Sequence, residues 1–161
     1  MNENQIDYFL YSNLGKNMGD KRFVDFYEGT FSADEIVRNH VDLKRAKCFG
    51  FIFNTLERMS AKDRVGHWLC LYIQIKPESK MLNLKFLDSL KKTYYWYGKH
   101  VSKYIDRMRN MALRNNFKFN LDIVQFALQS DNSKICGGYA CYGIMKLAHC
   151  KGVSLIFFCK F

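Results

Sequence analysis

The stretch Gln129-Ser-Asp-Asn-Ser-Lys-Ile-Cys136-Gly-Gly-Tyr-Ala-Cys141 sets a cysteine at the start of a predicted helix, shortly after an amide side chain. From Tyr139 to Leu147, small and apolar residues recur at spacings of three and four, which predicts a helix with one buried face. Unpaired N–H groups and the macrodipole at a helix N-terminus favour a thiolate over a thiol. Cys136 is therefore a candidate nucleophile, and a buried structural thiol is the alternative.

The composition predicts one globular domain over residues 1–161. Of the 161 residues, 48% are hydrophobic and 16% are aromatic, which is enough for a substantial core. The formal net charge of +10 favours an acidic partner such as nucleic acid, and a solvated basic surface is the common alternative. No apolar run approaches membrane-spanning length, and the first residues lack the basic and apolar regions of a secretory signal, so no membrane partner is expected.

The cysteines show the pattern of reduced thiols rather than of a disulfide framework. They contain no Cys-x-x-Cys pair, and no histidine spacing matches a zinc site, so no metal is expected. Cys70 and Cys141 lie inside apolar runs. We therefore expect an intracellular, reducing compartment. The six cysteines are Cys48, Cys70, Cys136, Cys141, Cys150 and Cys159.

Two predicted strands bring a polar residue to the same end of a hairpin. Residues 67–75 are nearly all apolar, which is typical of a strand buried on both faces. A turn with the only proline follows, and residues 81–88 then alternate apolar and polar side chains as a second strand. Because the start of one antiparallel strand adjoins the end of its partner, His67 and Asp88 are expected to be neighbours.

The rest of the chain is read as further strands and helices without an internal repeat. Residues 48–53 form a short apolar run with β-type residues, and residues 117–128 alternate as a strand that leads to Gln129. Residues 97–115 show the period of a helix. We expect a short helix and packed loops in residues 1–30, and a core strand or packed terminus in residues 153–159.

One face of the predicted helix over residues 97–115 is basic. Lys99, Lys103 and Arg107 are spaced by four residues, and Arg114 lies two turns further along. Such a stripe is suited to a phosphate backbone, and a solvated helix face is the alternative. A nucleic-acid-binding module without catalysis is therefore one hypothesis for the function.

Four residues match the needs of nucleophilic catalysis by cysteine. The chemistry requires a base, a group that orients the base, and donors for the developing oxyanion. His67, Asp88, Gln129 and Cys136 can fill these roles. Each has another interpretation by itself: His67 as a strand-edge histidine, Asp88 as a helix cap and Gln129 as a surface amide.

The order and setting of these residues resemble the adenain-like cysteine proteases. The motifs are Gly66-His67-Trp68, Leu87-Asp88-Ser89 and Gln129-x6-Cys136-Gly137, and the resemblance covers residues 29–147. The same arrangement occurs in a wider clan that includes the SUMO-specific proteases and the African swine fever virus polyprotein protease. The resemblance implies an α+β fold, with a central mixed sheet, helices packed around it and the nucleophile at the N-terminus of a core helix.

The resemblance also implies a mechanism and a class of substrate. It makes His67 the general base, Asp88 the group that orients it, Cys136 the nucleophile, and Gln129 with nearby N–H groups the oxyanion hole. Adenain-like enzymes cleave at Gly-Gly or Gly-X sites, and Trp68, Gly137 and Gly138 suit a narrow substrate channel. The implied substrates are polyprotein or structural-protein precursors cut during virion maturation, in the host nucleus, the cytoplasm or the virion.

The resemblance further implies DNA or a peptide as an activator, with no cofactor required for the chemistry itself. Adenain is linked to its peptide by a cysteine upstream of the nucleophile, but no cysteine lies between Cys70 and Cys136 here, which argues against that route. The acid is aspartate, as in the deconjugating branch of the clan. A protease that acts on a ubiquitin-like protein conjugate is therefore the alternative within the same chemistry.

Overall fold

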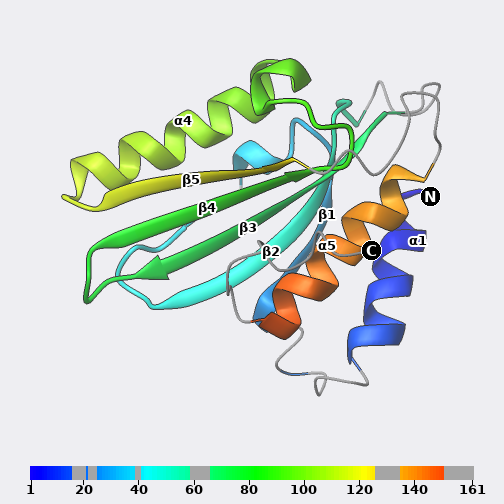
Figure 1. Cartoon of the computed structure of the whole chain (residues 1–161), viewed down its shortest axis with the longest axis horizontal. Coiled ribbons are helices and arrows are strands. Elements are labelled where there is room, and N and C mark those ends of the chain that lie inside the picture. The colour runs from blue at the N-terminus through cyan, green and yellow to red at the C-terminus, as the bar shows by residue number, and fades with distance from the viewer. Residues whose placement is uncertain (16–20, 22–24, 39–40, 59–65, 126–134, 151–161) are drawn as a thin grey trace.

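Five strands form one mixed sheet in the order β1-β2-β3-β4-β5 (Figure 1). The computed structural model describes residues 1–15, 21, 25–38, 41–58, 66–125 and 135–150. The inner pairs, β2 with β3 and β3 with β4, are antiparallel, whereas both edge strands run parallel to their neighbours. The expected α+β class with a mixed sheet is confirmed. The strands are β1 (Tyr27–Phe31), β2 (Lys47–Asn54), β3 (Trp68–Lys76), β4 (Met81–Asp88) and β5 (Lys118–Gln125).

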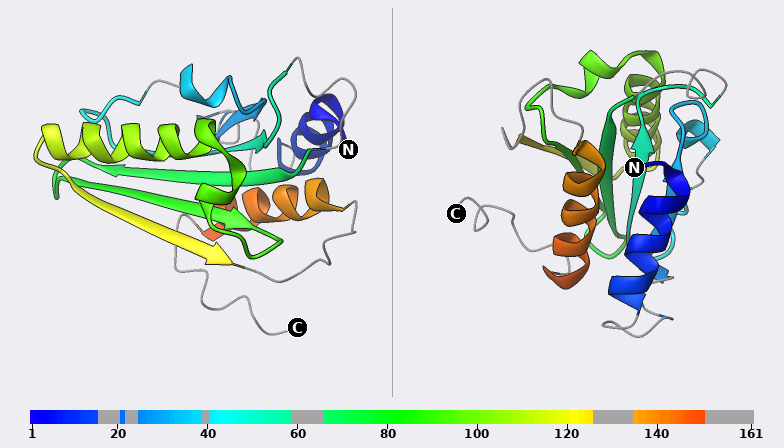
Figure 2. Two further views of the ribbon diagram at one scale, coloured as in Figure 1. Left: turned by 90° about the horizontal axis from the view of Figure 1, so that it is seen from above. Right: turned by 90° about the vertical axis from the view of Figure 1, so that its right-hand side faces the viewer.

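Helices cover both faces of the sheet. α4 (Lys99–Arg114) lies on one face, and α1 (Glu3–Leu10) and α5 (Cys136–Cys150) lie on the other (Figure 2). The chain therefore builds three layers, and each face of the sheet has its own core. Shorter helical turns are η1 (Tyr11–Gly15), η2 (Ile36–Arg38) and η4 (Tyr94–Tyr97).

β3 contributes to both cores because successive side chains of a strand point to opposite faces. Leu69 and Leu71 pack in the core beneath α4, whereas Cys70 and Tyr72 pack in the core beneath α1 and α5. All four are buried. The prediction of a strand covered on both faces is confirmed, and the reason is that helices flank the sheet on both sides.

The hairpin and the two long helices are also confirmed. β3 and β4 pair antiparallel, from Cys70 opposite Leu87 to Lys76 opposite Met81. α4 buries the apolar side chains that set its period, and α5 begins at Cys136, where the sequence places the start of a helix. The local periodicity of these segments was therefore a sufficient guide to their structure.

The first strand was not predicted. Residues 1–30 contain the expected short helix, α1, but also β1, which pairs parallel with β2. The register of that pairing shifts between Tyr27 and Thr30, and Gly29 has a φ of 117°. An irregular strand of this kind lacks the strict alternation by which strands are found in a sequence. The predictions for Gln129 and for residues 153–159 lie outside the described residues.

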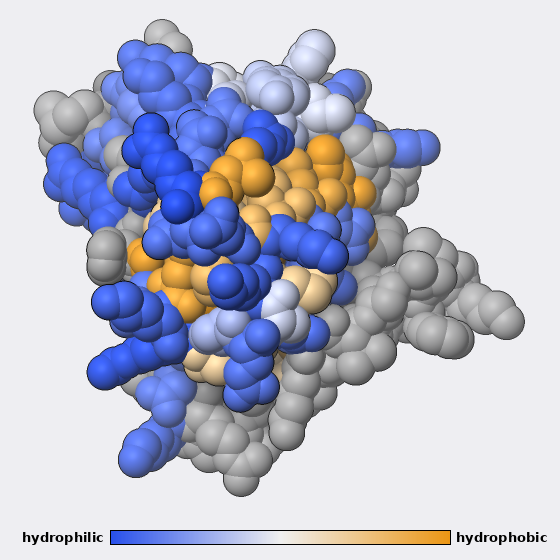
Figure 3. All heavy atoms as spheres, turned by 90° about the vertical axis from the view of Figure 1, so that its left-hand side faces the viewer, coloured by the Kyte–Doolittle hydropathy of each residue, from blue (hydrophilic) through white to orange (hydrophobic). Residues whose placement is uncertain are grey.

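The two ends of the sheet differ. The start of α5 lies at one end, and at the other end hydrophilic side chains surround an apolar area (Figure 3).

Among the described residues, no helix combines the length and the hydrophobicity that a membrane span requires.

Candidate active site

His67 and Asp88 meet at the end of the β3–β4 hairpin. The Nε2–H of His67 donates to Oδ1 of Asp88 at 2.8 Å. The backbone of His67 is held from the other side, because its N–H donates to Oγ1 of Thr55 at 3.0 Å and its carbonyl accepts from the N–H of Thr55 at 2.9 Å. His67 and Asp88, expected from the antiparallel hairpin to be neighbours, are therefore joined by a direct hydrogen bond.

Asp88 is buried and accepts four hydrogen bonds. Besides the bond from His67, its oxygens accept from the N–H of Leu90 at 3.0 Å, the N–H of Lys92 at 2.6 Å and the hydroxyl of Tyr97 at 2.7 Å. Burial raises the pKa of the Asp88 carboxyl, but the bond from His67 and the other donors outweigh burial and lower the pKa below its ordinary value. Asp88 is therefore an ionised carboxylate at neutral pH.

Cys136 lies at the N-terminus of α5 with 6% of its surface exposed. Burial raises the pKa of its thiol, but a hydrogen bond with His67 and the N–H groups of Trp68 and Gly137 outweigh burial, and the pKa is lowered. Because Asp88 occupies Nε2 of His67, Nδ1 is the ring nitrogen left for the sulfur. The structure thus brings three of the four predicted residues together.

The pKa of His67 is raised to about 9. Burial lowers the pKa of the imidazole, but hydrogen bonds with Asp88 and Cys136 outweigh burial and favour the imidazolium. A raised imidazole pKa beside a lowered thiol pKa favours a thiolate–imidazolium pair over a neutral one. Such a pair holds both an activated nucleophile and a proton for a leaving group.

Tyr97 is a contributor that sequence reasoning missed. Its ring stacks on the ring of His67, with centroids 5.4 Å apart and planes 20° apart, while its hydroxyl donates to Asp88. From the sequence, Tyr97 was expected only to begin a helical segment. The available signal was its position nine residues after the acid, within the aromatic run 94–97.

Two of the three residues predicted to line a substrate channel adjoin each other. A Cβ at Gly137 would lie 3.4 Å from Cδ1 of Trp68, so these two residues adjoin, whereas a Cβ at Gly138 would meet nothing within 4 Å. Met1 lies against the same wall: the indole N–H of Trp68 donates to the Met1 carbonyl at 2.9 Å. Trp68 and Gly137 therefore form a wall beside Cys136, and the space next to Gly138 is open.

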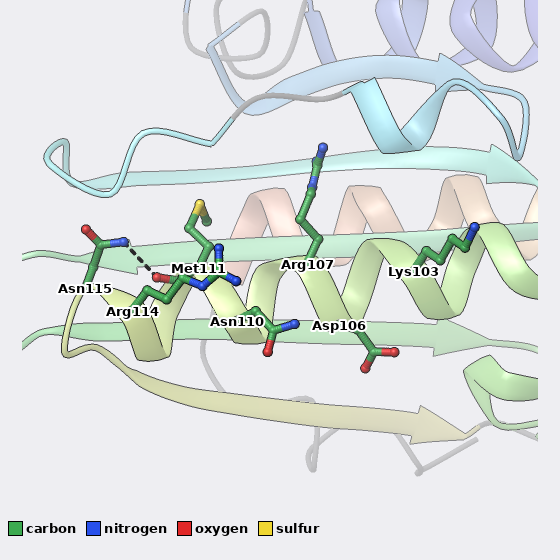
Figure 4. Close-up of a pocket in the computed structure, with 7 residues that line it drawn as sticks. All are labelled: Lys103, Asp106, Arg107, Asn110, Met111, Arg114 and Asn115. Carbon is green, nitrogen blue, oxygen red and sulfur yellow. Dashed lines mark hydrogen bonds between the residues drawn. The ribbon is translucent and has the colours of Figure 1, made fainter.

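The basic stripe lies on α4, across the sheet from α5 (Figure 1). Lys103, Arg107 and Arg114 line one surface depression of about 540 Å³ (Figure 4). Lys99 lies outside this lining, with its ammonium 4.0 Å from the Glu57 carboxylate. Three of the four predicted cations thus share one surface. The other lining residues are Asp106, Asn110, Met111 and Asn115.

No group of three or more His, Cys, Asp or Glu side chains within the described residues is arranged to hold a metal ion. Cys48, Cys70, Cys136 and Cys141 are free thiols.

No family model and no curated protein matches this sequence. Among solved structures, the fold is similar to that of the ASFV pS273R protease, with a TM-score of 0.50 and 12% identity over 78% of this chain and 51% of that chain. It is also similar to AvrA delL154 with IP6 and CoA, with a TM-score of 0.52 and 12% identity over 90% and 49% of the two chains.

The Legionella pneumophila effector RavZ matches with a TM-score of 0.43 and 15% identity over 83% of this chain and 46% of RavZ. The chain thus spans about half the length of the structures that it matches. At these identities the likeness shows the fold alone. The protein shares its α+β fold with the ASFV pS273R protease.

Proposed function

We propose that the protein is a cysteine endopeptidase of the adenain-like type. One observation carries the proposal: His67 bonds to buried Asp88 through one nitrogen and interacts with Cys136 at a helix N-terminus. The pKa of the Cys136 thiol is lowered and that of the His67 imidazole is raised, as nucleophilic catalysis by cysteine requires. The fold shared with the ASFV pS273R protease supports the same conclusion.

In the proposed reaction, the Cys136 thiolate attacks the carbonyl carbon of the scissile peptide bond. The carbonyl oxygen becomes an oxyanion, which the N–H groups at the start of α5 and the Gln129 side chain stabilise. The C–N bond then breaks, His67 gives its proton to the leaving amine, and a thioester forms on Cys136. His67 next takes a proton from water, which attacks the thioester and releases the acid and the thiolate.

The proposed substrates are viral precursor proteins that are cut at Gly-Gly or Gly-X sites during maturation. The wall of Trp68 and Gly137 supports a small residue at the cleavage site, because even a Cβ at Gly137 would lie 3.4 Å from Cδ1 of Trp68. Removal of a ubiquitin-like protein from a conjugate is the alternative, with the same three residues. Since AvrA has been solved with CoA, acyl transfer from coenzyme A is a further chemistry to test with this fold.

The decisive experiment compares two cysteine variants on fluorogenic Gly-Gly-X peptides under reducing conditions. Cys136→Ala is expected to abolish turnover, whereas Cys141→Ala, one turn further along α5, is expected to retain it. Equal turnover by all three proteins, or none by the wild type, would contradict the proposal. Vinyl-sulfone probes of a ubiquitin-like protein label Cys136 if deconjugation is the reaction, and acetyl-CoA acylates it if acyl transfer is.

DNA is proposed as an activator that binds the basic face of α4. The cations that line the depression on this helix support this proposal. Lys103→Ala and Arg107→Ala are each expected to reduce the slope of log affinity against log salt by about one unit. Lys76→Ala, at the exposed end of β3, removes a charge elsewhere and is the matched control. Binding to DNA without any peptidase activity would favour the non-catalytic alternative.

A further inference from the structure

The segment of residues 89–98, here called the aromatic loop, is fixed in place by Asp88. Both oxygens of the carboxylate bind it, through the N–H groups of Leu90 and Lys92 and the hydroxyl of Tyr97. Between the two bound amides, Lys91 adopts a φ of 60°, a conformation that a non-glycine residue rarely holds unless its surroundings impose it. The loop therefore has a defined shape beside the His67–Asp88 pair.

The aromatic loop divides its side chains between the core and the surface. η4 has about three residues per turn, so Tyr94 and Tyr97 lie on one side of it. Tyr94 is buried in the core, and Tyr97 stacks on His67. Tyr95 and Trp96 are left outside with 61% and 71% of their surfaces exposed. Trp and Tyr are enriched among the residues that carry most of the binding energy of protein interfaces.

The charge of the aromatic loop is entirely positive. No acidic residue occurs between Ser89 and Lys99. The ammonium of Lys92 lies 5.1 Å from the centre of the Trp96 ring, and Lys91 is exposed. Lys99 is already close to Glu57, and Arg109, which contacts Tyr95 from α4, is paired with Asp106. Lys91 and Lys92 are therefore the loop's own cations next to the aromatic pair. This surface is complementary to a carboxylate beside an apolar side chain.

We propose that the aromatic loop is the docking surface for the polypeptide substrate. Tyr95 and Trp96 bind an aromatic or large apolar side chain, and Lys91 and Lys92 bind an acidic side chain next to it. The proposal rests on the proposed peptidase function, because Asp88 joins this surface to the proposed catalytic histidine. The substrate class is therefore a chain with an acidic and aromatic segment near a small-residue cleavage site.

Three kinds of fluorogenic peptide test the inference, with one Gly-Gly-X core and a flank of Glu-Glu-Phe, Lys-Lys-Phe or Ser-Gly-Ser. Each flank is tested once before the core and once after it. For the Glu-Glu-Phe peptide, Trp96→Ala is expected to raise KM by about tenfold and to change kcat much less. Lys92→Ala is expected to raise KM for the acidic peptide only. Leu113→Ala, which alters another exposed apolar residue at the far end of α4, is the matched control.

A binding measurement keeps the inference separate from catalysis. The same peptides, labelled for fluorescence anisotropy, are titrated into the Cys136→Ala protein and into that variant with Trp96→Ala. Tighter binding of the Glu-Glu-Phe peptide, lost with Trp96, supports the docking surface even if no peptide is cleaved. Equal affinity for all three peptides, or affinity that Trp96→Ala leaves unchanged, overturns it even if the protein is an active peptidase.

Discussion

Tyr97 holds two neighbouring residues at once, because its ring stacks on His67 and its hydroxyl donates to Asp88. The two contacts act on different parts of the proposed catalytic pair. The stack restrains the plane of the imidazole, and the hydrogen bond stabilises the ionised carboxylate that orients it. Tyr97 is therefore a positioning residue rather than a catalytic one.

Tyr97→Phe removes the hydrogen bond and keeps the stack. Because a hydrogen bond to a charged group contributes about 1.5–3 kcal/mol, we expect a loss of stability within that range and a lower kcat/KM. Tyr97→Ala should lower kcat/KM further. Peptide kinetics and urea denaturation measure both effects, with Tyr8→Phe on the exposed side of α1 as the control. Wild-type values for Tyr97→Ala would rule out the positioning role.

The two thiols near the start of α5 should differ in their pH dependence. The pKa of Cys136 is lowered, whereas burial raises the pKa of Cys141 to about 12. The thiolate reacts with iodoacetamide, so labelling of Cys136 should persist below the ordinary thiol pKa of about 8.5. Cys141 should stay unlabelled at neutral pH.

His67→Ala removes a hydrogen bond that lowers the Cys136 pKa, so the midpoint of Cys136 labelling should move to higher pH. Mass spectrometry of peptides after timed labelling gives the midpoint for each cysteine. A Cys136 midpoint equal to that of glutathione in the wild type would count against the thiolate–imidazolium pair.

At the scale of elements, α5 can approach the sheet closely because glycines lie where the helix and the sheet meet. A Cβ at Gly50 on β2 would lie 2.8 Å from Cδ1 of Ile144 and 3.3 Å from the carbonyl oxygen of Leu71. A Cβ at Gly143 on α5 would lie 3.1 Å from Cδ2 of Leu87. These contacts set the distance between the helix that carries Cys136 and the hairpin that carries His67.

Gly50→Ala is expected to destabilise the fold by about 1–3 kcal/mol, because the added methyl group overpacks the contact with Ile144. Gly138→Ala is the matched control: its Cβ meets nothing within 4 Å, and alanine in a helix is favoured over glycine by about 0.5–1 kcal/mol. Urea denaturation compares the free energies of unfolding. If Gly50→Ala is as stable as the wild type, α5 does not pack as closely as described.

For the whole molecule, the His67–Asp88 pair links stability to pH. The pKa of His67 is raised, so its contribution is complete below the unfolded value of about 6.5 and is lost as the pH rises through the folded value of about 9. The pKa of Asp88 is lowered, so its contribution is complete above about 3.9 and is lost as the pH falls through the folded value. Both contributions are complete between about pH 4 and 6.5.

The stability difference between the wild type and His67→Gln should therefore be largest within this window. The raised pKa of His67 corresponds to about 3 kcal/mol, and this part should disappear above about pH 9. Urea denaturation at several pH values measures the difference, with His100→Gln as the control for loss of a histidine. A difference that does not vary with pH would exclude the predicted linkage.

Most of the fold was predictable because its signals are local. Alternation defined β4, continuous apolar runs defined β2 and β3, and helical spacing defined α4 and α5. The meeting of His67 and Asp88 followed from one hairpin, since antiparallel pairing dictates which ends adjoin. β1 was missed because its irregular pairing with β2 leaves no periodic pattern in the sequence.

The candidate residue types for the chemistry, and the elements that present them, could be read from the sequence, because periodicity and spacing are properties of neighbouring residues. The tertiary structure adds the contacts of Cys136 with His67, of Tyr97 with both His67 and Asp88, and of Gly137 with Trp68. These contacts depend on the packing of segments that are distant in the sequence. In particular, the thiol at the start of α5 has a lowered pKa through its contacts with His67 and Trp68, which the sequence of the helix does not contain.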